Sequence, residues 1–244
     1  MGLLHSALPI VADSLVLYFD AANTKSYPGS GTTWTDISGG HSATITGPSH
    51  QSVFNGGFEY DGTSSNDRIT FPNTALPNGL GAAFSIEVWH YLDNDAAPNS
   101  TWTYGSLFTN GGGSGDWSVG AGNNNGIIFG FDRIVRRNGS GSEINTAYSS
   151  VPSVKTWHQH VLTINSGTGN VYVDKSNVLS NDTNFRSNYT QVTGDSGIGI
   201  SDIYGGNYRG EFDGYISIVR IYSKVLSTAE MEQNFDATKG RYNL

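Results

Sequence analysis

Glu87 is the first residue to test for sugar chemistry, because it stands in a segment, 84–92, that alternates apolar and polar side chains. Retaining glycoside hydrolysis needs two carboxyl groups about 5 Å apart. Glu87 is followed by Val88 and Trp89, and the next acid is Asp93, so no second carboxylate is placed beside it. We therefore interpret Glu87 as a hydrogen-bonded or exposed strand residue and expect no enzymatic activity.

His158 and His160 have the spacing that places two side chains on one face of a strand, where they could bind a metal such as zinc. A third ligand is not identifiable nearby, so we interpret one of them as a packing or hydrogen-bonding histidine. The sequence contains no Ser-His-Asp set and no P-loop. The glycine-rich run 111–115 leads to Trp117 and a predicted strand, which indicates a loop and not a phosphate site.

Two segments combine aromatic and polar side chains that suit sugar binding, since a sugar presents apolar faces as well as hydroxyl groups. The first contains Trp102 and Tyr104, and the second contains Tyr204, Asn207 and Tyr208. Aromatic residues in loops also anchor contacts between subunits. The sequence leaves these two roles open.

Composition limits the class of partner. The 244 residues include 13 Lys and Arg against 21 Asp and Glu, a net charge of -8. Nucleic acid is therefore an unexpected partner, because neutralisation of phosphates supplies most of that affinity. The chain has no cysteine, so no disulfide framework exists. Its length suits one all-β domain.

The first residues predict an arm outside the core. They have no basic region and no long apolar run, so we expect neither a secretion signal nor a membrane span. They also match the short Met-Gly-x-x-x-Ser myristoylation pattern. We interpret residues 1–13 as an apolar arm that packs on a neighbouring subunit or on the domain itself. Residues 14–244 are expected to form a single domain with a short C-terminal tail.

Short segments rich in β-branched and aromatic residues recur between Gly, Asn and Pro clusters, which is typical of an all-β sandwich. The predicted strands cover 14–19, 43–46, 58–60, 68–71, 84–92, 106–109, 117–120, 126–133, 156–165, 171–175, 197–201 and 212–222. We expect 212–222 to be a central strand. In 84–92 we expect Phe84, Ile86 and Val88 on one face and Glu87 and Trp89 on the other.

One helix is predicted, directly after the last strand. Ser227 is suited to be its N-cap, and Glu230 completes a capping box. Leu226 and Met231 have the spacing of a hydrophobic staple, and Met231 and Phe235 should face inward.

Several segments in chain order carry a resemblance to a known superfamily: 60–63, 66–69, 84–89, 157–164, 171–174, 214–222 and 226–231. Together they look like the successive signatures of the concanavalin A-like, laminin-G-type jelly rolls. The resemblance covers roughly residues 15–234. It implies an all-β jelly-roll sandwich of two antiparallel sheets, each of six or seven strands and one of them curved, with one short C-terminal helix.

A narrower resemblance concerns residues 15–40 and 233–242, which are similar to laminin-G-like domains of tailed-phage virion proteins. It implies a non-enzymatic virion structural protein, displayed on the particle surface as a capsid or tail decoration protein. Its partners would be capsid or tail proteins, and it would form a homo-oligomer. The alternatives are a carbohydrate-binding adhesin or receptor-binding module that contacts host-surface glycans, and an accessory domain of a secreted glycosidase. Display and adhesion need the same sandwich and exposed loops.

The resemblance also implies calcium, which the superfamily often binds through Asp, Asn and carbonyl oxygens. Asp61 and Asp67 lie in the matching early segments, so the resemblance implies them as ligands, and Asp20 and Asp213 are further candidates. Many relatives have an Asp-Glu pair where this chain has Ser217 and Ile218. Capping of turns is the alternative role of these aspartates.

Overall fold

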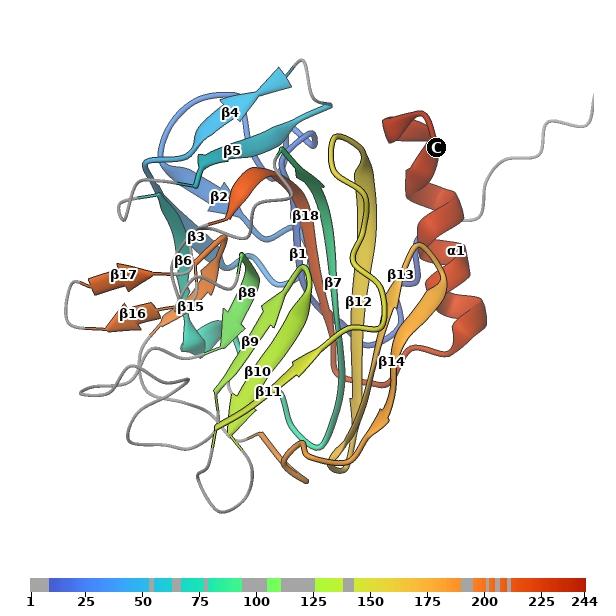
Figure 1. Ribbon diagram of the computed structural model, residues 1–244. Helices are drawn as coiled ribbons and strands as arrows, with labels where there is room; N and C mark the ends of the chain where they lie inside the picture. Colours follow the sequence, from blue (N-terminus) through green and yellow to red (C-terminus); the bar gives the residue numbers. More distant parts are fainter. Residues whose placement is uncertain are drawn as a thin grey trace, which may run out of the picture.

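The computed structural model describes residues 9–52, 55–62, 67–76, 79–93, 105–110, 126–137, 143–189, 195–200, 202–204, 207–209 and 212–244. In these parts of the chain, two antiparallel eight-stranded sheets form the two layers of a sandwich. A C-terminal helix lies against the outer side of one layer (Figure 1). The predicted all-β jelly roll with one short C-terminal helix is confirmed.

The first sheet is built around its two longest strands. Its order is β14 (Ser176–Asp182), β13 (Thr168–Val173), β12 (Trp157–Asn165), β7 (Ala83–Leu92), β18 (Asp213–Tyr222), β5 (Gly57–Asp61) and β4 (Ser49–Gln51), and β1 (Leu15–Asp20) also pairs with β18. β18 runs beside β7 from Gly214, opposite Leu92, to Tyr222, opposite Ser85. The predicted central position of the last strand is confirmed.

The second sheet contains shorter strands. Its order is β11 (Glu143–Ala147), β10 (Arg133–Arg137), β9 (Ile127–Gly130), β8 (Ser106–Asn110), β15 (Asp195–Ile198), β6 (Arg68–Pro72), β3 (Ser42–Thr46) and β2 (Thr33–Thr35). A separate pair is formed by β16 (Asp202–Tyr204) and β17 (Asn207–Arg209). The expected strand 117–120 lies outside the described residues.

Two strand expectations were wrong. The chain reverses within 126–133, so this segment contributes to two strands, with Ile134 of β10 opposite Phe129 of β9. The apolar run hides the reversal because residues on both sides of the turn face the core. Each sheet has eight strands, more than the expected six or seven, because edge strands as short as three residues, such as β2 and β4, extend the sheets.

The alternation predicted for β7 is confirmed. Phe84, Ile86 and Val88 are fully buried in the main core between the sheets. Glu87 and Trp89 lie on the opposite face and are also fully buried. Both faces of the central strands are therefore covered, one by the second sheet and the other by the C-terminal segment.

That segment contains α1 (Thr228–Thr238) and the short 3-10 helix η3 (Lys239–Tyr242). The capping box is confirmed, since the Ser227 hydroxyl accepts from the Glu230 amide and the Glu230 carboxylate accepts from the Ser227 amide. Leu226 and Met231 are buried in one apolar cluster, as the predicted staple requires. None of the helices in the described ranges is long and apolar enough to cross a membrane.

A buried ion pair connects the two layers where β10 of the second sheet lies against the end of β14 of the first sheet. Arg136 of β10 donates to the Asp182 carboxylate at the end of β14 and, at 3.0 Å, to the Thr146 hydroxyl. Its guanidinium lies 4.3 Å from the centre of the Phe185 ring. This pair fixes the end of the second sheet against the first.

Candidate functional site

Glu87 sits on the outer face of the first sheet, under α1. One carboxylate oxygen, Oε1, accepts hydrogen bonds from Arg220 at 2.7 Å, Trp89 at 2.9 Å and Gln159 at 3.0 Å. The other, Oε2, accepts from the Asn234 amide of α1 at 2.8 Å. The side chain is 0% exposed, so this carboxylate binds four groups of its own chain and reaches no solvent.

Arg220 extends the network toward the first strand. Its guanidinium lies 4.7 Å from the Tyr18 ring centre and donates to the Tyr18 and Thr238 hydroxyls, each at 3.3 Å. Burial alone would lower the pKa of Arg220, but the Glu87 carboxylate, together with Tyr18 and Tyr222, offsets burial and raises that pKa. The pair is thus a permanent part of the fold.

Asn234 joins the N-terminal residues to the same network. Its amide nitrogen also donates to the Tyr222 hydroxyl at 2.9 Å, and its amide oxygen accepts from the Val11 backbone at 2.8 Å. The Gln233 amide donates to the Pro9 carbonyl at 2.6 Å. Pro9 and Val11 therefore contact α1 of their own chain.

Asp20, a further calcium candidate, forms an ion pair with Arg241 of the C-terminal segment. Its two carboxylate oxygens accept from the two terminal nitrogens of Arg241 at 2.7 and 2.9 Å, and Asp20 is 1% exposed. The next residue, Tyr242, stacks on Trp157 and Trp89 with ring centres 4.3 and 4.9 Å apart. Asp20 therefore neutralises Arg241 and does not face solvent.

Asp61 and Asp67, the predicted calcium ligands, lie at one rim of the sandwich. Asp61 ends β5 opposite Asp213 of β18, and Asp67 Oδ2 accepts from the Asp61 backbone at 3.4 Å. Burial raises the pKa of Asp67, and the nearby carboxylates of Asp61 and Glu59 add to the rise. Among the described residues, no group of three His, Cys, Asp or Glu side chains is arranged to hold a metal. Calcium at Asp61 and Asp67 stays a prediction.

The histidines predicted to share a face do so, and they form hydrogen bonds. His160 Nε2 lies 3.1 Å from the Phe131 carbonyl, which only accepts, so this nitrogen carries the hydrogen. His160 Nδ1 then accepts from His90 Nε2, 2.7 Å away. His158 is bonded to Asp174 and to the Ser153 carbonyl. The interpretation as a hydrogen-bonding histidine is confirmed, and it holds for both residues.

The predicted aromatic loops are only partly described. Trp102 and Tyr104 lie outside the described residues. Tyr204 of β16 faces Asn207 of β17 across the two-stranded pair, and Tyr208 pairs with Ile203. The backbone thus brings Tyr204, Asn207 and Tyr208 together, and their role in glycan or partner contact stays a prediction.

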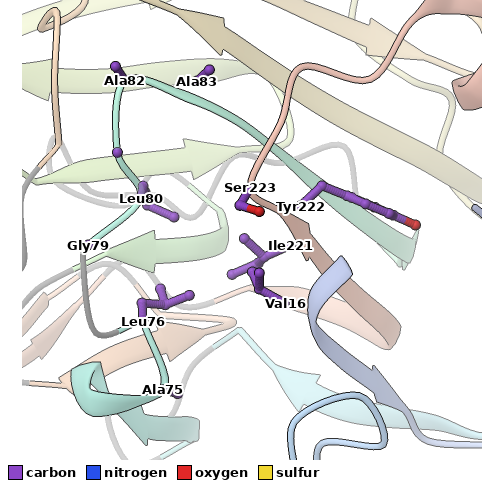
Figure 2. Close-up of a pocket in the computed structure, with 11 residues that line it drawn as sticks. Val16, Ala75, Leu76, Gly79, Leu80, Ala82, Ala83, Ile221, Tyr222 and Ser223 are labelled. Carbon is purple, nitrogen blue, oxygen red and sulfur yellow. The ribbon is translucent and has the colours of Figure 1, made fainter. Parts of the chain in front are cut away.

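Two hollows lie elsewhere on the described surface. The larger, about 430 Å³, is bounded by Val16 of β1, Ile221 at the end of β18, and Leu76 and Leu80 before β7. Figure 2 shows these four aliphatic side chains directed toward one another, with the Ser223 hydroxyl nearby. Aliphatic walls with so few polar groups suit a small apolar group and do not satisfy the hydroxyls of a sugar.

The second hollow, which we call the Tyr27 groove, has a different chemistry. Its volume is about 330 Å³. It is lined by Ala21, Ala22, Thr24, Tyr27, Pro28, Gly29, His50, Ser52, Asn55, Gly56 and Arg241. Aromatic, hydroxyl, amide and guanidinium groups therefore meet in one shallow depression, between the loop after β1, the β4–β5 turn and η3.

Comparison with known proteins defines the class. The sequence pattern of the concanavalin A-like lectin/glucanases superfamily, in its laminin G type, matches residues 61–232, well over half of the chain. The chain therefore belongs to this superfamily. Comparison with curated protein sequences finds no match.

Solved structures show the same fold at low sequence identity. Domain 4 of AbnA, an extracellular arabinanase of Geobacillus stearothermophilus solved with arabinotriose, has a TM-score of 0.64 and 16% identity, covering 92% of this chain and 98% of that one. Trypanosoma rangeli sialidase in complex with the inhibitor DANA has a TM-score of 0.64 and 15% identity, covering 98% of this chain. The botulinum neurotoxin serotype G binding domain has a TM-score of 0.54 and 16% identity, covering 89% of this chain and 50% of that one. This chain spans 36% of the sialidase.

Sequence reasoning missed the Tyr27 groove. Its residues come from three segments that are far apart in the chain, and Asp20 and Arg241 are separated by 221 positions. One local signal was available, the Asn55-Gly56 dipeptide, which is typical of a tight turn with positive φ, and both residues do have positive φ, 60° and 78°. That signal locates a turn and does not identify its partners.

Proposed function

We propose that this protein is a carbohydrate-binding domain that does not hydrolyse its ligand. The observation that carries the proposal is the environment of Glu87, whose carboxylate accepts four hydrogen bonds and is 0% exposed beneath α1. A glycosidase acid must reach the glycosidic oxygen and stand opposite a second carboxyl group. Glu87 meets neither requirement, which supports binding without hydrolysis.

Two further observations support sugar as the ligand class. The chain belongs to a lectin and glucanase superfamily, and a structurally similar arabinanase domain was solved with arabinotriose. The Tyr27 groove presents the mixture of apolar and polar groups that a sugar requires.

The test is a glycan array with the purified protein, followed by titration calorimetry and a reducing-sugar assay on every glycan that binds. We expect saturable binding to at least one oligosaccharide and no release of reducing ends. Glu87→Gln should leave the array profile unchanged at a temperature where the variant is folded. Hydrolysis of a bound glycan that the Glu87→Gln variant loses would refute the proposal.

Display on a phage particle stays a prediction, and it is compatible with glycan binding because an adhesin on a virion needs both properties. Mass spectrometry of purified particles tests the location, and absence of the protein from them would contradict it. Capsid or tail proteins as partners also stay a prediction. The predicted homo-oligomer is tested by light scattering of the purified protein. A single-chain mass at all concentrations would contradict it.

A further inference from the structure

We propose that the Tyr27 groove is the glycan site and that it selects uncharged sugars. This inference rests on the proposed function and adds the place and the chemical class of the ligand. The groove lies at the β4 edge of the first sheet, apart from the predicted loop residues Tyr204, Asn207 and Tyr208.

The first argument is the geometry of Arg241. Its two terminal nitrogens each donate one hydrogen to Asp20, at 2.7 and 2.9 Å, which holds the guanidinium plane in one orientation. A guanidinium has five N–H groups, so Asp20 occupies two of them, and Tyr242 also interacts with this side chain. The Arg241 side chain is 32% exposed, whereas that of Asp20 is 1% exposed. Arg241 is therefore a donor at the groove whose orientation is held by its two hydrogen bonds to the buried Asp20 carboxylate.

The second argument is the pairing of donors with acceptors. His50 Nε2 donates to the Ala21 carbonyl at 3.0 Å, so in the neutral ring its Nδ1 is an acceptor. The exposed Asn55 carries an amide that both donates and accepts, and Ser52 and Thr24 add exposed hydroxyls. Sugar hydroxyls also donate and accept at once, so this mixed set satisfies them, whereas a set of donors alone would favour an anion.

The third argument is the rigid apolar part of the groove. The Tyr27 ring packs against His50 and Phe58, with ring centres 4.8 and 4.9 Å away, and Pro28 is exposed beside it. Gly56 packs so closely on Ala22 that an added Cβ would lie 2.6 Å from the Ala22 Cα. The two walls are thus held together before any ligand arrives, which lowers the entropy cost of binding.

Charge and size define the ligand class. The Arg241 charge is already neutralised by Asp20, no lysine lines the groove, and the whole chain has a net charge of -8. An acidic sugar would find no unpaired cation there. The volume of about 330 Å³ is close to the lower limit of small-ligand pockets. We therefore infer a neutral saccharide, bound through about one or two rings.

Two substitutions test the site, and each has a matched control. Asn55→Gly removes the amide at a position with φ 60°, where glycine is not strained, and Asn181→Gly makes the same change at φ 51° on β14, at the opposite edge of the sheet. Thr24→Trp fills the groove, and Thr183→Trp adds the same ring at another exposed threonine. Thermal unfolding of all four variants should match that of the parent.

The probes are maltotriose, cellotriose, arabinotriose and the best neutral glycan from the array, with sialyllactose and digalacturonate as acidic counterparts, each titrated by calorimetry. We expect Asn55→Gly to weaken neutral-sugar binding about threefold to tenfold, the loss of one hydrogen bond. Thr24→Trp should abolish binding, the two controls should change it by less than about twofold, and the acidic sugars should bind at least about tenfold more weakly.

The results distinguish a wrong site, a wrong selectivity and a wrong function. If the parent binds a sugar and both groove variants bind it equally well, the site is elsewhere and the proposed function stands. Tighter binding of the acidic sugars would overturn the selectivity. If the parent binds no glycan, both the proposed function and the site are refuted.

Discussion

Mild acid should destabilise this protein, because two neutral histidines are enclosed between its sheets. His90 and His160 are each 0% exposed. Burial and the charge of His158 lower the pKa of His160 to about 3, although the Asp174 carboxylate opposes that shift. Burial, with His160 and His158 nearby, also lowers the pKa of His90 well below its usual value. A proton added to His160 Nδ1 would face the His90 N–H at 2.7 Å.

The sign of the effect follows from where each state binds protons. An unfolded histidine binds a proton near pH 6.5, whereas folded His160 does so only near pH 3. The contribution of the neutral histidine to the free energy of unfolding is therefore fully present above about pH 6.5, and it is lost as the pH falls toward 3. Between pH 7.5 and 5, proton linkage predicts a loss of about 2 kcal/mol from His160, and His90 adds a loss of the same sign.

Urea titrations followed by tryptophan fluorescence at pH 7.5 and pH 5 measure this loss. In the double variant His90→Gln/His160→Gln, each side chain still offers a donor and an acceptor but cannot titrate. It should be less stable than the parent at pH 7.5 and should lose at least about 2 kcal/mol less between the two pH values. His41→Gln, at a partly exposed site, is the control and should behave as the parent does.

The difference in stability between pH 7.5 and pH 5 reports mainly on histidines, because most carboxylates stay charged down to about pH 5. If the parent and the double variant lost equal stability between pH 7.5 and pH 5, the buried histidines would not be the cause. The inferred hydrogen-bond chain from His90 to the Phe131 carbonyl would then be wrong.

Three further predictions concern the packing of the C-terminal segment and the groove, and urea titration measures all of them. Glu87→Gln should lower the free energy of unfolding by about 3 to 5 kcal/mol, because it leaves a buried guanidinium without its counter-charge; an effect below about 1 kcal/mol would contradict the network. Ser227→Ala should cost about 1 kcal/mol through the lost cap, and Met231→Ala about 2 to 5 kcal/mol through the buried cavity, so equal and negligible effects would mean that α1 does not cover the sheet. Gly56→Ala should cost about 1 to 3 kcal/mol more than Gly29→Ala, since both have positive φ but only the first meets neighbouring atoms; equal costs would show that the groove walls are not in close contact.

The sequence alone determined the features that depend on local pattern. Alternation in 84–92 identified the inward and outward faces of β7, and the capping signature located the start of α1 at Ser227. These succeeded because side-chain direction in a strand and amide capping in a helix depend on residues within a few positions. The superfamily was also identified at this level, from short motifs in chain order. The reversal inside 126–133 was not, because an apolar run is the same pattern on one strand or on two.

Only the tertiary structure decided what the polar residues do. Glu87 lies in an ordinary alternating strand, and its role as a buried acceptor depends on Arg220 and Asn234, which are 133 and 147 positions away. Asp20 was a further calcium candidate under the superfamily resemblance, yet Arg241 neutralises it from the other end of the chain. The order of strands in the sheet determines which distant residues meet. For example, β1 and β18 pair although most of the sequence separates them. A carboxylate's function depends on which charges and donors surround it in space, and periodicity along the chain contains no information about those partners.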